Sequence, residues 1–279
     1  MNKPKLGDIK FINCLPLHHG LMEGGFGEKV SIKSGTPAEL NSLVVAGELD
    51  VSPVSSIIYA RHSDKLLILP DVSISANGAL QSILLVSKYP IEQLKEARIA
   101  LTAKSATSHG LLKIIMYHAY QANPDYFISP LSLEGGVLKD AEAVLFIGDD
   151  ALQAYHNRVP GYYYYDLGDE WQRMTGLSMV YAVWVVNRQF AARHADLVHM
   201  VYQQVTGAFA YGLSNLSVAA ETLAPKVSFT TQQLITYINL LNYEFTPAHK
   251  QALVTYYQLS HVLGLIDGVP AIEFAEVMK

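Results

Sequence analysis

The sequence predicts an α/β protein of two lobes with a ligand cleft between them. Short apolar strands alternate with helical segments through the first two thirds of the chain, and this alternation favours parallel sheets covered by helices on both faces. Two such units follow each other without a flexible linker, and the apolar runs at 83–86 and 181–186 connect them. We therefore expect a first lobe of residues 1–86 and 184–279, with a helical C-terminal tail, and a second lobe of residues 87–183.

Composition and charge limit the partners of the protein. Of the 279 residues, 50% are hydrophobic and 16% are charged, which is typical of a compact protein with a large core. The net charge is −5 and the sequence has no Lys/Arg-rich run, which argues against nucleic acid as a partner. Because it has neither a signal-peptide core nor an apolar segment of ~20 residues, we expect a cytoplasmic protein with no membrane partner.

The first lobe is expected to alternate strands and helices from its start. Residues 9–12 resemble a strand, and Pro16 is well placed as the first residue of a helix. Residues 36–39 (Thr-Pro-Ala-Glu) match a capping box, which begins the next helix. Residues 49–51 read as a short strand, and the hydroxyl-rich turn at 52–56 leads into a further helix.

The alternation continues into the second lobe. Asn77-Gly78 marks a turn between the apolar strands at 66–69 and 83–86. Arg98–Leu101 is an expected strand that a hydroxyl-rich turn connects to a helix. Ala143–Ile147 is an expected buried strand that runs directly into another helix.

The remaining elements are an aromatic strand and a helical tail. The four tyrosines at 162–165 form the expected strand, and Asp166 is placed to cap the helix that follows. The tail carries a capping box at 230–233 and a helix that begins at Thr246-Pro247 and ends before Gly264. The tyrosine strand could face the core or a partner subunit, so a homodimer is one alternative.

Polar turns follow two of the expected strands and lead into helices. The first N–H groups of a helix lack partners, and the positive end of the helix dipole faces outward there. Such a site suits a carboxylate or a phosphate. The simpler alternative is that Thr107 or Ser108 only caps its own helix. The hydroxyl groups of the two turns belong to Ser55, Ser56, Ser105, Thr107 and Ser108.

These turns are expected to meet at one cleft. In open α/β sheets, ligands bind beyond the carboxyl ends of the strands, and this rule places Asn13 and Gly148-Asp149 beside the hydroxyl-rich turns. Residue types alone leave simpler roles open, since Asn13 could cap the helix at Pro16 and Ser82 could be a hydroxyl at the side of a strand. The expected ligand is a small anionic molecule held by local donors.

Metal, disulfide and cofactor motifs are not found. Cys14 is the single cysteine. As a nucleophile it would need a base such as His18 or His19, and a small apolar residue at a strand end is the simpler interpretation. The ten histidines lack the spacing of metal ligands, and glycine-rich phosphate-binding motifs are absent. We therefore expect no metal and no cofactor.

Several stretches together resemble one enzyme family. They are residues 13–16 (Asn-Cys-Leu-Pro), the turn at 77–82, residues 101–112 (LTAKSATSHGLL), residues 143–152, and residues 165–171 with the strand to 186. In order and spacing they resemble the chorismate dehydratases of the futalosine route to menaquinone. The likeness covers most of the chain.

The resemblance implies a type II periplasmic-binding-protein-like fold, shared with the 1,4-dihydroxy-6-naphthoate synthase of the same route. It also implies that chorismate, a dicarboxylate, loses water to give 3-(1-carboxyvinyloxy)benzoate. The catalytic residues of the family correspond to Asn13 and Ser82, and its carboxylate-binding turns to Ser55 and Thr107-Ser108. The synthase is expected to carry a catalytic His where this chain has Gly148, which favours the dehydratase. A non-catalytic protein that binds a small carboxylate is the other alternative.

Overall fold

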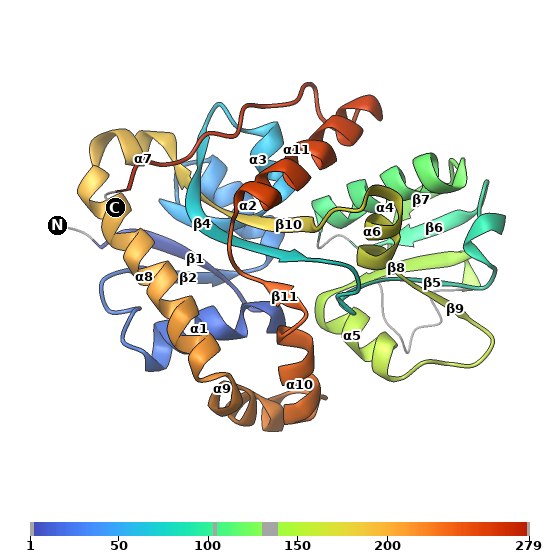
Figure 1. Ribbon diagram of the computed structural model, residues 1–279, viewed down its shortest axis with the longest axis horizontal. Coiled ribbons are helices and arrows are strands. Elements are labelled where there is room, and N and C mark those ends of the chain that lie inside the picture. The colour runs from blue at the N-terminus through green and yellow to red at the C-terminus, as the bar shows by residue number, and fades with distance from the viewer. Residues whose placement is uncertain (1–2, 103–104, 130–138, 278–279) are drawn as a thin grey trace.

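Two β-sheets lie side by side and form the framework of the protein, of which the computed structural model describes residues 3–102, 105–129 and 139–277 (Figure 1). The first sheet has the strand order β11-β4-β10-β3-β1-β2, and the second has the order β7-β6-β8-β5-β9. The chain enters the second sheet after β4 and returns to the first with β10, so each sheet is the centre of one lobe. Residues 103–104 of the stretch at 101–112 lie outside the described residues.

The first sheet is mixed, because β1 runs parallel to β2 and β3 whereas β10 runs antiparallel to β3 and β4. Its strands are β1 (Lys5–Ile9), β2 (Ser31–Gly35), β3 (Val51–Ser55), β4 (Leu66–Ala76), β10 (Met179–Asn187) and β11 (Leu241–Asn242). In Figure 1, α1 (Leu15–Glu23) and α8 (Ala195–Ser214) cover one face, and α2 (Pro37–Val45), α3 (Ser56–Arg61) and α11 (Pro247–Val262) cover the other. Shorter elements complete the lobe: η1 (Ile12–Cys14), α7 (Arg188–Arg193), α9 (Leu216–Leu223), η4 (Ala224–Lys226) and α10 (Thr231–Ile238).

The second sheet is also covered on both faces. Its strands are β5 (Ile83–Ser87), β6 (Arg98–Leu101), β7 (Asp125–Ile128), β8 (Ala143–Ile147) and β9 (Tyr163–Asp166), and η2 (Ile91–Gln93) follows β5. α4 (Ala106–Tyr120) and α6 (Leu167–Thr175) lie on one face and α5 (Gly148–His156) on the other (Figure 1). Within the described parts of the chain, no helix is both long and apolar enough to cross a membrane.

Apolar burial holds the sheets and helices together. Every residue of β3, β5 and β8 is buried, as expected for central strands with helices on both faces. Trp184 of β10 packs edge-on against Phe209 of α8, with ring centroids 5.2 Å apart. Trp171 of α6 packs in the same way against Tyr256 of α11, at 6.1 Å, and so joins the two lobes.

Helix starts follow the sequence closely. The capping boxes at Thr36 and Thr230 are both formed, and the Asp166 side chain accepts a hydrogen bond from the Gly168 N–H at 2.9 Å. The strand predicted at 9–12 is wrong, because β1 ends at Ile9 and Ile12–Cys14 is a short 3-10 helix. Phe11 and Ile12 misled the prediction, because both pack in or against the hydrophobic core without belonging to a strand.

The turn predicted at 52–56 is extended instead. β3 continues to Ser55, and α3 begins at Ser56 without an intervening turn. Pro53 lies opposite Trp184 of β10, and β1 pairs with β3 only at Val51, so the missing N–H of the proline interrupts no bond to β1.

The chain changes sheets a few residues away from the predicted lobe boundaries. β5, which the sequence assigns to the first lobe, pairs with β8 and β9 in the second sheet. The start of β10, which it assigns to the second lobe, pairs with β3 and β4 in the first. The connections are therefore the short segments at 77–82 and 176–178. Continuous apolar strands read alike in sequence whichever sheet they join, which explains the difference.

The connection at 77–82 is held by one carboxylate. Asp166 Oδ2 accepts hydrogen bonds from the Leu80 N–H at 3.1 Å and from the Gln81 N–H at 2.6 Å. Gln81 has a φ of 65°, a left-handed conformation that non-glycine residues rarely adopt. Burial raises the pKa of Asp166 to about 6, although these backbone donors favour its charged form.

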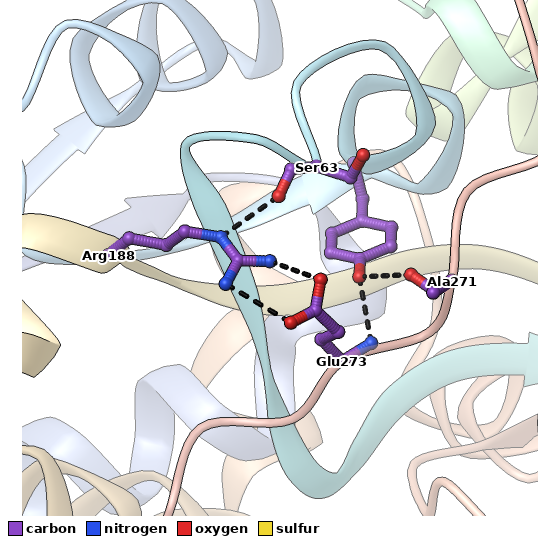
Figure 2. Close-up of polar contacts among 5 residues, drawn as sticks. Ser63, Arg188, Ala271 and Glu273 are labelled. Carbon is purple, nitrogen blue, oxygen red and sulfur yellow. Dashed lines mark hydrogen bonds and ion pairs between the residues drawn. The ribbon is translucent and has the colours of Figure 1, made fainter.

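After α11 the chain runs back along the first lobe and is fastened there (Figure 1). Figure 2 shows the Arg188 guanidinium donating to both carboxylate oxygens of Glu273, at 2.7 and 3.3 Å, and to the Ser63 carbonyl at 3.0 Å. The buried Tyr59 hydroxyl donates to the Ala271 carbonyl at 2.8 Å and accepts from the Glu273 N–H at 2.9 Å.

The same segment pairs with β4. The Ile68 N–H donates to the Glu273 carbonyl at 2.9 Å, and the Ile68 carbonyl accepts from the Ala275 N–H at 2.8 Å. β11 pairs with β4 only at Ser75 and Ala76, so the C-terminal segment occupies part of the side that this short strand leaves open.

Candidate functional site

A cleft opens between the lobes, where the carboxyl ends of β1, β3, β6 and β8 converge. The empty space in it, counting the part open to solvent, is about 670 Å³. Most of the wall is apolar. The polar side chains that line it belong to Asn13, Ser55, Ser82, Ser105, Thr107, Ser108, Tyr181 and Tyr237.

Asn13 brings an unsatisfied acceptor to this cleft. Its side-chain Oδ1 is buried and has no hydrogen-bond partner among the described residues, whereas its backbone carbonyl accepts from the Tyr243 hydroxyl at 2.9 Å. The N-cap of α1 is Cys14 and receives no side-chain bond, so the alternative that Asn13 caps this helix is wrong. Burying an amide oxygen without a partner costs about 1–3 kcal/mol, and a bound ligand would recover that cost.

Ser82 connects the two sides of the cleft. It ends the 77–82 connection, is only 4% exposed, and its carbonyl accepts from the Gly148 N–H at 2.7 Å. Its hydroxyl accepts a hydrogen bond from the Tyr237 hydroxyl at 2.9 Å. Ser82 is thus fixed at its backbone by the second lobe and at its side chain by the first.

The two hydroxyl-rich helix starts differ in their capping. Ser105, and not Thr107 or Ser108, is the N-cap of α4, because its Oγ accepts from the Ser108 N–H at 3.3 Å. The Ser105 and Ser108 hydroxyls lie 2.9 Å apart. Ser55 occupies the N-cap position of α3 but makes no side-chain bond to that helix. Both starts therefore place serine hydroxyls on the cleft wall.

Thr107 joins the lobes. Its Oγ1 accepts from the Ile57 N–H of α3 at 3.2 Å and lies 3.3 Å from the Ser56 hydroxyl. The Ser56 hydroxyl donates to the Val180 carbonyl at 2.8 Å. Ser56 is fully buried by these contacts and does not line the cleft, which corrects its predicted role as a substrate ligand.

Of the neighbours Gly148 and Asp149, only Gly148 lines the cleft. Gly148 lines the cleft with a φ of 58°, and a Cβ there would lie 3.6 Å from the Phe11 ring. The carboxylate of Asp149 instead accepts from the Ile12 N–H at 3.3 Å and is not part of the cleft wall. The predicted role of Asp149 as a substrate ligand is therefore corrected as well, since it bridges α5 and η1.

Cys14 lines the cleft but is not activated. Burial, and after it the charges of Asp8 and Asp149, raise the pKa of its thiol well above the ordinary range. A neutral thiol is a weak nucleophile. Its environment matches the interpretation of Cys14 as a small apolar residue, but Cys14 belongs to η1 and not to the end of a strand.

Sequence reasoning missed two tyrosines of the cleft wall. Tyr181 lies on β10 and Tyr237 on α10, and both are at least nine-tenths buried. Each lies among apolar residues in the sequence, where a tyrosine is predicted to be part of the hydrophobic core. The capping box of α10 was visible, but nothing local indicated that this helix packs against η1 beside the cleft.

Comparisons with known proteins identify the family of the chain. A family model described as menaquinone biosynthesis matches residues 4–261. The chain is 37% identical over 198 residues to a chorismate dehydratase of Thermus thermophilus, a match that covers 66% of this chain and 70% of the relative.

Solved structures show the same fold at low identity. A protein of Archaeoglobus fulgidus superposes with a TM-score of 0.77 and 17% identity, covering 95% of this chain and 98% of the other. A Candida albicans protein described as having the generic periplasmic binding protein fold gives 0.71 and 13%, covering 98% and 93%. The predicted fold class is confirmed, and the chain belongs to the menaquinone biosynthesis family.

Proposed function

We propose that the protein is a chorismate dehydratase, which removes water from chorismate to give 3-(1-carboxyvinyloxy)benzoate. The observation that carries the proposal is the meeting of the unpartnered Asn13 amide oxygen and the Ser82 hydroxyl in one cleft between the lobes. The chorismate dehydratase activity of the Thermus thermophilus relative supports it.

The proposed ligand is a doubly charged ring. Ser55 stands at one helix start, and Ser105 and Ser108 stand at the other, so each start offers hydroxyl donors to one carboxylate. α4 is long enough for its dipole to add to the attraction at the second start. Among the described residues that line the cleft, none is a carboxylate that would repel such a ligand.

The proposed reaction begins with loss of the proton at C3 of chorismate, and this proton and the C4 hydroxyl together make up the water that is released. This hydrogen is acidic because the ring carboxylate is conjugated with it, and the charge spreads into an extended dienolate. Donors at the ring carboxylate then stabilise the charged intermediate more than the substrate. The C4 hydroxyl leaves next, and formation of the aromatic ring drives this second step. The ether and hydroxyl are trans, so the proton and the hydroxyl leave from one face, which favours the stepwise route.

Asn13 and Ser82 have different proposed parts in this route. An amide oxygen is too weak a base to take the C3 proton, so Asn13 orients the substrate or a water through its free Oδ1. Ser82 donates a hydrogen bond to the departing hydroxyl. These roles are consistent with a cleft whose thiol and phenols stay protonated, because burial raises the pKa values of Cys14 and Tyr237.

Two alternatives make different predictions. The 1,4-dihydroxy-6-naphthoate synthase is expected to carry a catalytic His at the position of Gly148, where this chain has a left-handed glycine. A non-catalytic carboxylate-binding protein would bind chorismate and release it unchanged.

The test is an incubation of the purified protein with chorismate, followed by mass spectrometry and ultraviolet spectroscopy. The expected product is lighter than chorismate by one water and has an aromatic spectrum, and heat-treated protein is the control. Chorismate recovered intact, with saturable binding by calorimetry, would show a binding protein instead. A cytoplasmic location and a homodimer stay predictions, and light scattering after gel filtration tests the second.

A further inference from the structure

The Ser82 hydroxyl is held by a hydrogen bond that runs in one direction. A serine hydroxyl has one hydrogen to donate and two lone pairs that accept. The Tyr237 hydroxyl donates to Ser82 Oγ at 2.9 Å, which occupies one lone pair and leaves the serine hydrogen unused. No acceptor for that hydrogen is found among the described residues, and both side chains line the cleft.

Tyr237 is itself rigidly placed. It lies near the end of α10, whose start is fixed by the capping box of Thr230 and Gln233. Its side chain is 2% exposed, and the helix packs against η1, the element that carries Asn13. Tyr237 therefore reaches Ser82 from the opposite lobe to Gly148, which holds the Ser82 backbone.

The direction of this bond matters for loss of a hydroxyl group. A departing hydroxyl needs a donor, but a free serine can also turn and accept a hydrogen bond from that same hydroxyl. A phenol that stays protonated keeps a donor aimed at Oγ, which occupies one of its two lone pairs and favours the orientation in which the serine hydrogen points into the cleft. Burial raises the pKa of Tyr237, so the phenol keeps its proton and is not the base.

We infer that Tyr237 is a positioning residue, which orients Ser82 so that its hydroxyl donates toward the cleft. The inference rests on the proposed function, because it assigns Ser82 to the leaving hydroxyl of chorismate. It adds a residue of the helical tail to a site otherwise formed by strand ends and helix starts.

The test is a double-mutant cycle of Tyr237→Phe and Ser82→Ala, with kcat and KM for chorismate measured at enzyme concentrations raised for the slow variants but kept below that of the substrate. Tyr237→Phe is expected to lower kcat about tenfold, the size of one misdirected hydrogen bond, with KM changed less than about twofold. In the Ser82→Ala background the same change is expected to have no further effect. Tyr59→Phe is the matched control, since its hydroxyl bonds outside the cleft, and it should keep the wild-type kcat.

Each other outcome counts against the inference. A wild-type kcat in Tyr237→Phe, or an equal loss in the presence and absence of Ser82, would mean that Tyr237 does not act through the serine. A rise in KM without a fall in kcat would place Tyr237 in substrate binding instead. Absence of turnover in the wild-type protein would overturn the proposed function, and with it the inference. Wild-type turnover therefore distinguishes a failure of the proposed function from a failure of the inference about Tyr237.

Discussion

Asn13 is the residue whose surroundings point most directly to a ligand. Its Oδ1 is buried, unpartnered and placed on the cleft wall, while its backbone is held by Tyr243. A fold gains nothing from an orphaned acceptor, so a bound molecule is the expected partner.

Replacing this amide is expected to harm turnover more than binding. Asn13→Ala should lower kcat about 100-fold, because an orienting group acts mainly as the reaction proceeds. The affinity for the product, measured by calorimetry, should change only a few-fold. Asn157→Ala removes an exposed amide at the end of α5 and should leave both quantities unchanged. Unchanged turnover in Asn13→Ala would remove this residue from the mechanism.

The backbone conformation at position 148, and not a shortage of space for a side chain, explains why a glycine is found there. A Cβ would meet the Phe11 ring at an ordinary 3.6 Å, but the φ of 58° is unfavourable for any L residue. Gly148→Ala is therefore expected to lower the free energy of unfolding in urea by about 1–2 kcal/mol. Gly268→Ala, in open space and without a positive φ, should lower it by less than half as much. Equal effects would contradict the backbone explanation.

At the scale of the elements, a hydrogen bond to the Thr107 hydroxyl connects α3 with α4. Thr107 Oγ1 accepts the Ile57 N–H, which is one of the N–H groups that α3 cannot satisfy itself. A residue of the second lobe thus completes the start of a helix in the first.

Removal of that hydroxyl should weaken the joint. Thr107→Val keeps the shape but leaves the Ile57 N–H buried without an acceptor, so the free energy of unfolding in urea is expected to fall by about 1–3 kcal/mol. Thr222→Val is the control, because the Thr222 hydroxyl bonds within an exposed face of α9. A loss no larger than that of the control would mean that water replaces Thr107 at α3.

Elements defined by local chemistry could be read from the sequence, and contacts between lobes could not. Capping boxes at Thr36 and Thr230 need only four consecutive residues, so their prediction succeeded. The orientation of Ser56 and Asp149 depends on elements that are distant in sequence: the Ser56 hydroxyl donates to Val180 of β10, and the Asp149 carboxylate accepts from Ile12 of the other lobe. Tyr237 was missed for the same reason.

Across the whole molecule, the lobes are joined by two short connections, and Asp166 holds one of them. Burial raises its pKa from 3.8 to about 6, so between these values the folded protein binds more protons than the unfolded chain. The contribution of this group to stability is therefore fully present below about pH 4 and is lost as the pH rises through about 6.

Asp166→Asn should remove this dependence on pH. Urea unfolding of both proteins is measured at several pH values from 4 to 7. The free energy of unfolding of the wild type is expected to rise relative to that of the variant as the pH falls through 6. Parallel stability curves would mean that Asp166 titrates alike in the folded and unfolded chains.

The C-terminal segment that pairs with Ile68 has a further consequence for how the protein behaves at high concentration. It covers main-chain groups of β4 that β11 is too short to reach. Without residues 273–275, those groups would offer a ready template for a strand from another copy, and shortened versions of the chain should aggregate. Residues 273–275 thereby shield this part of β4 from pairing with a strand of another copy.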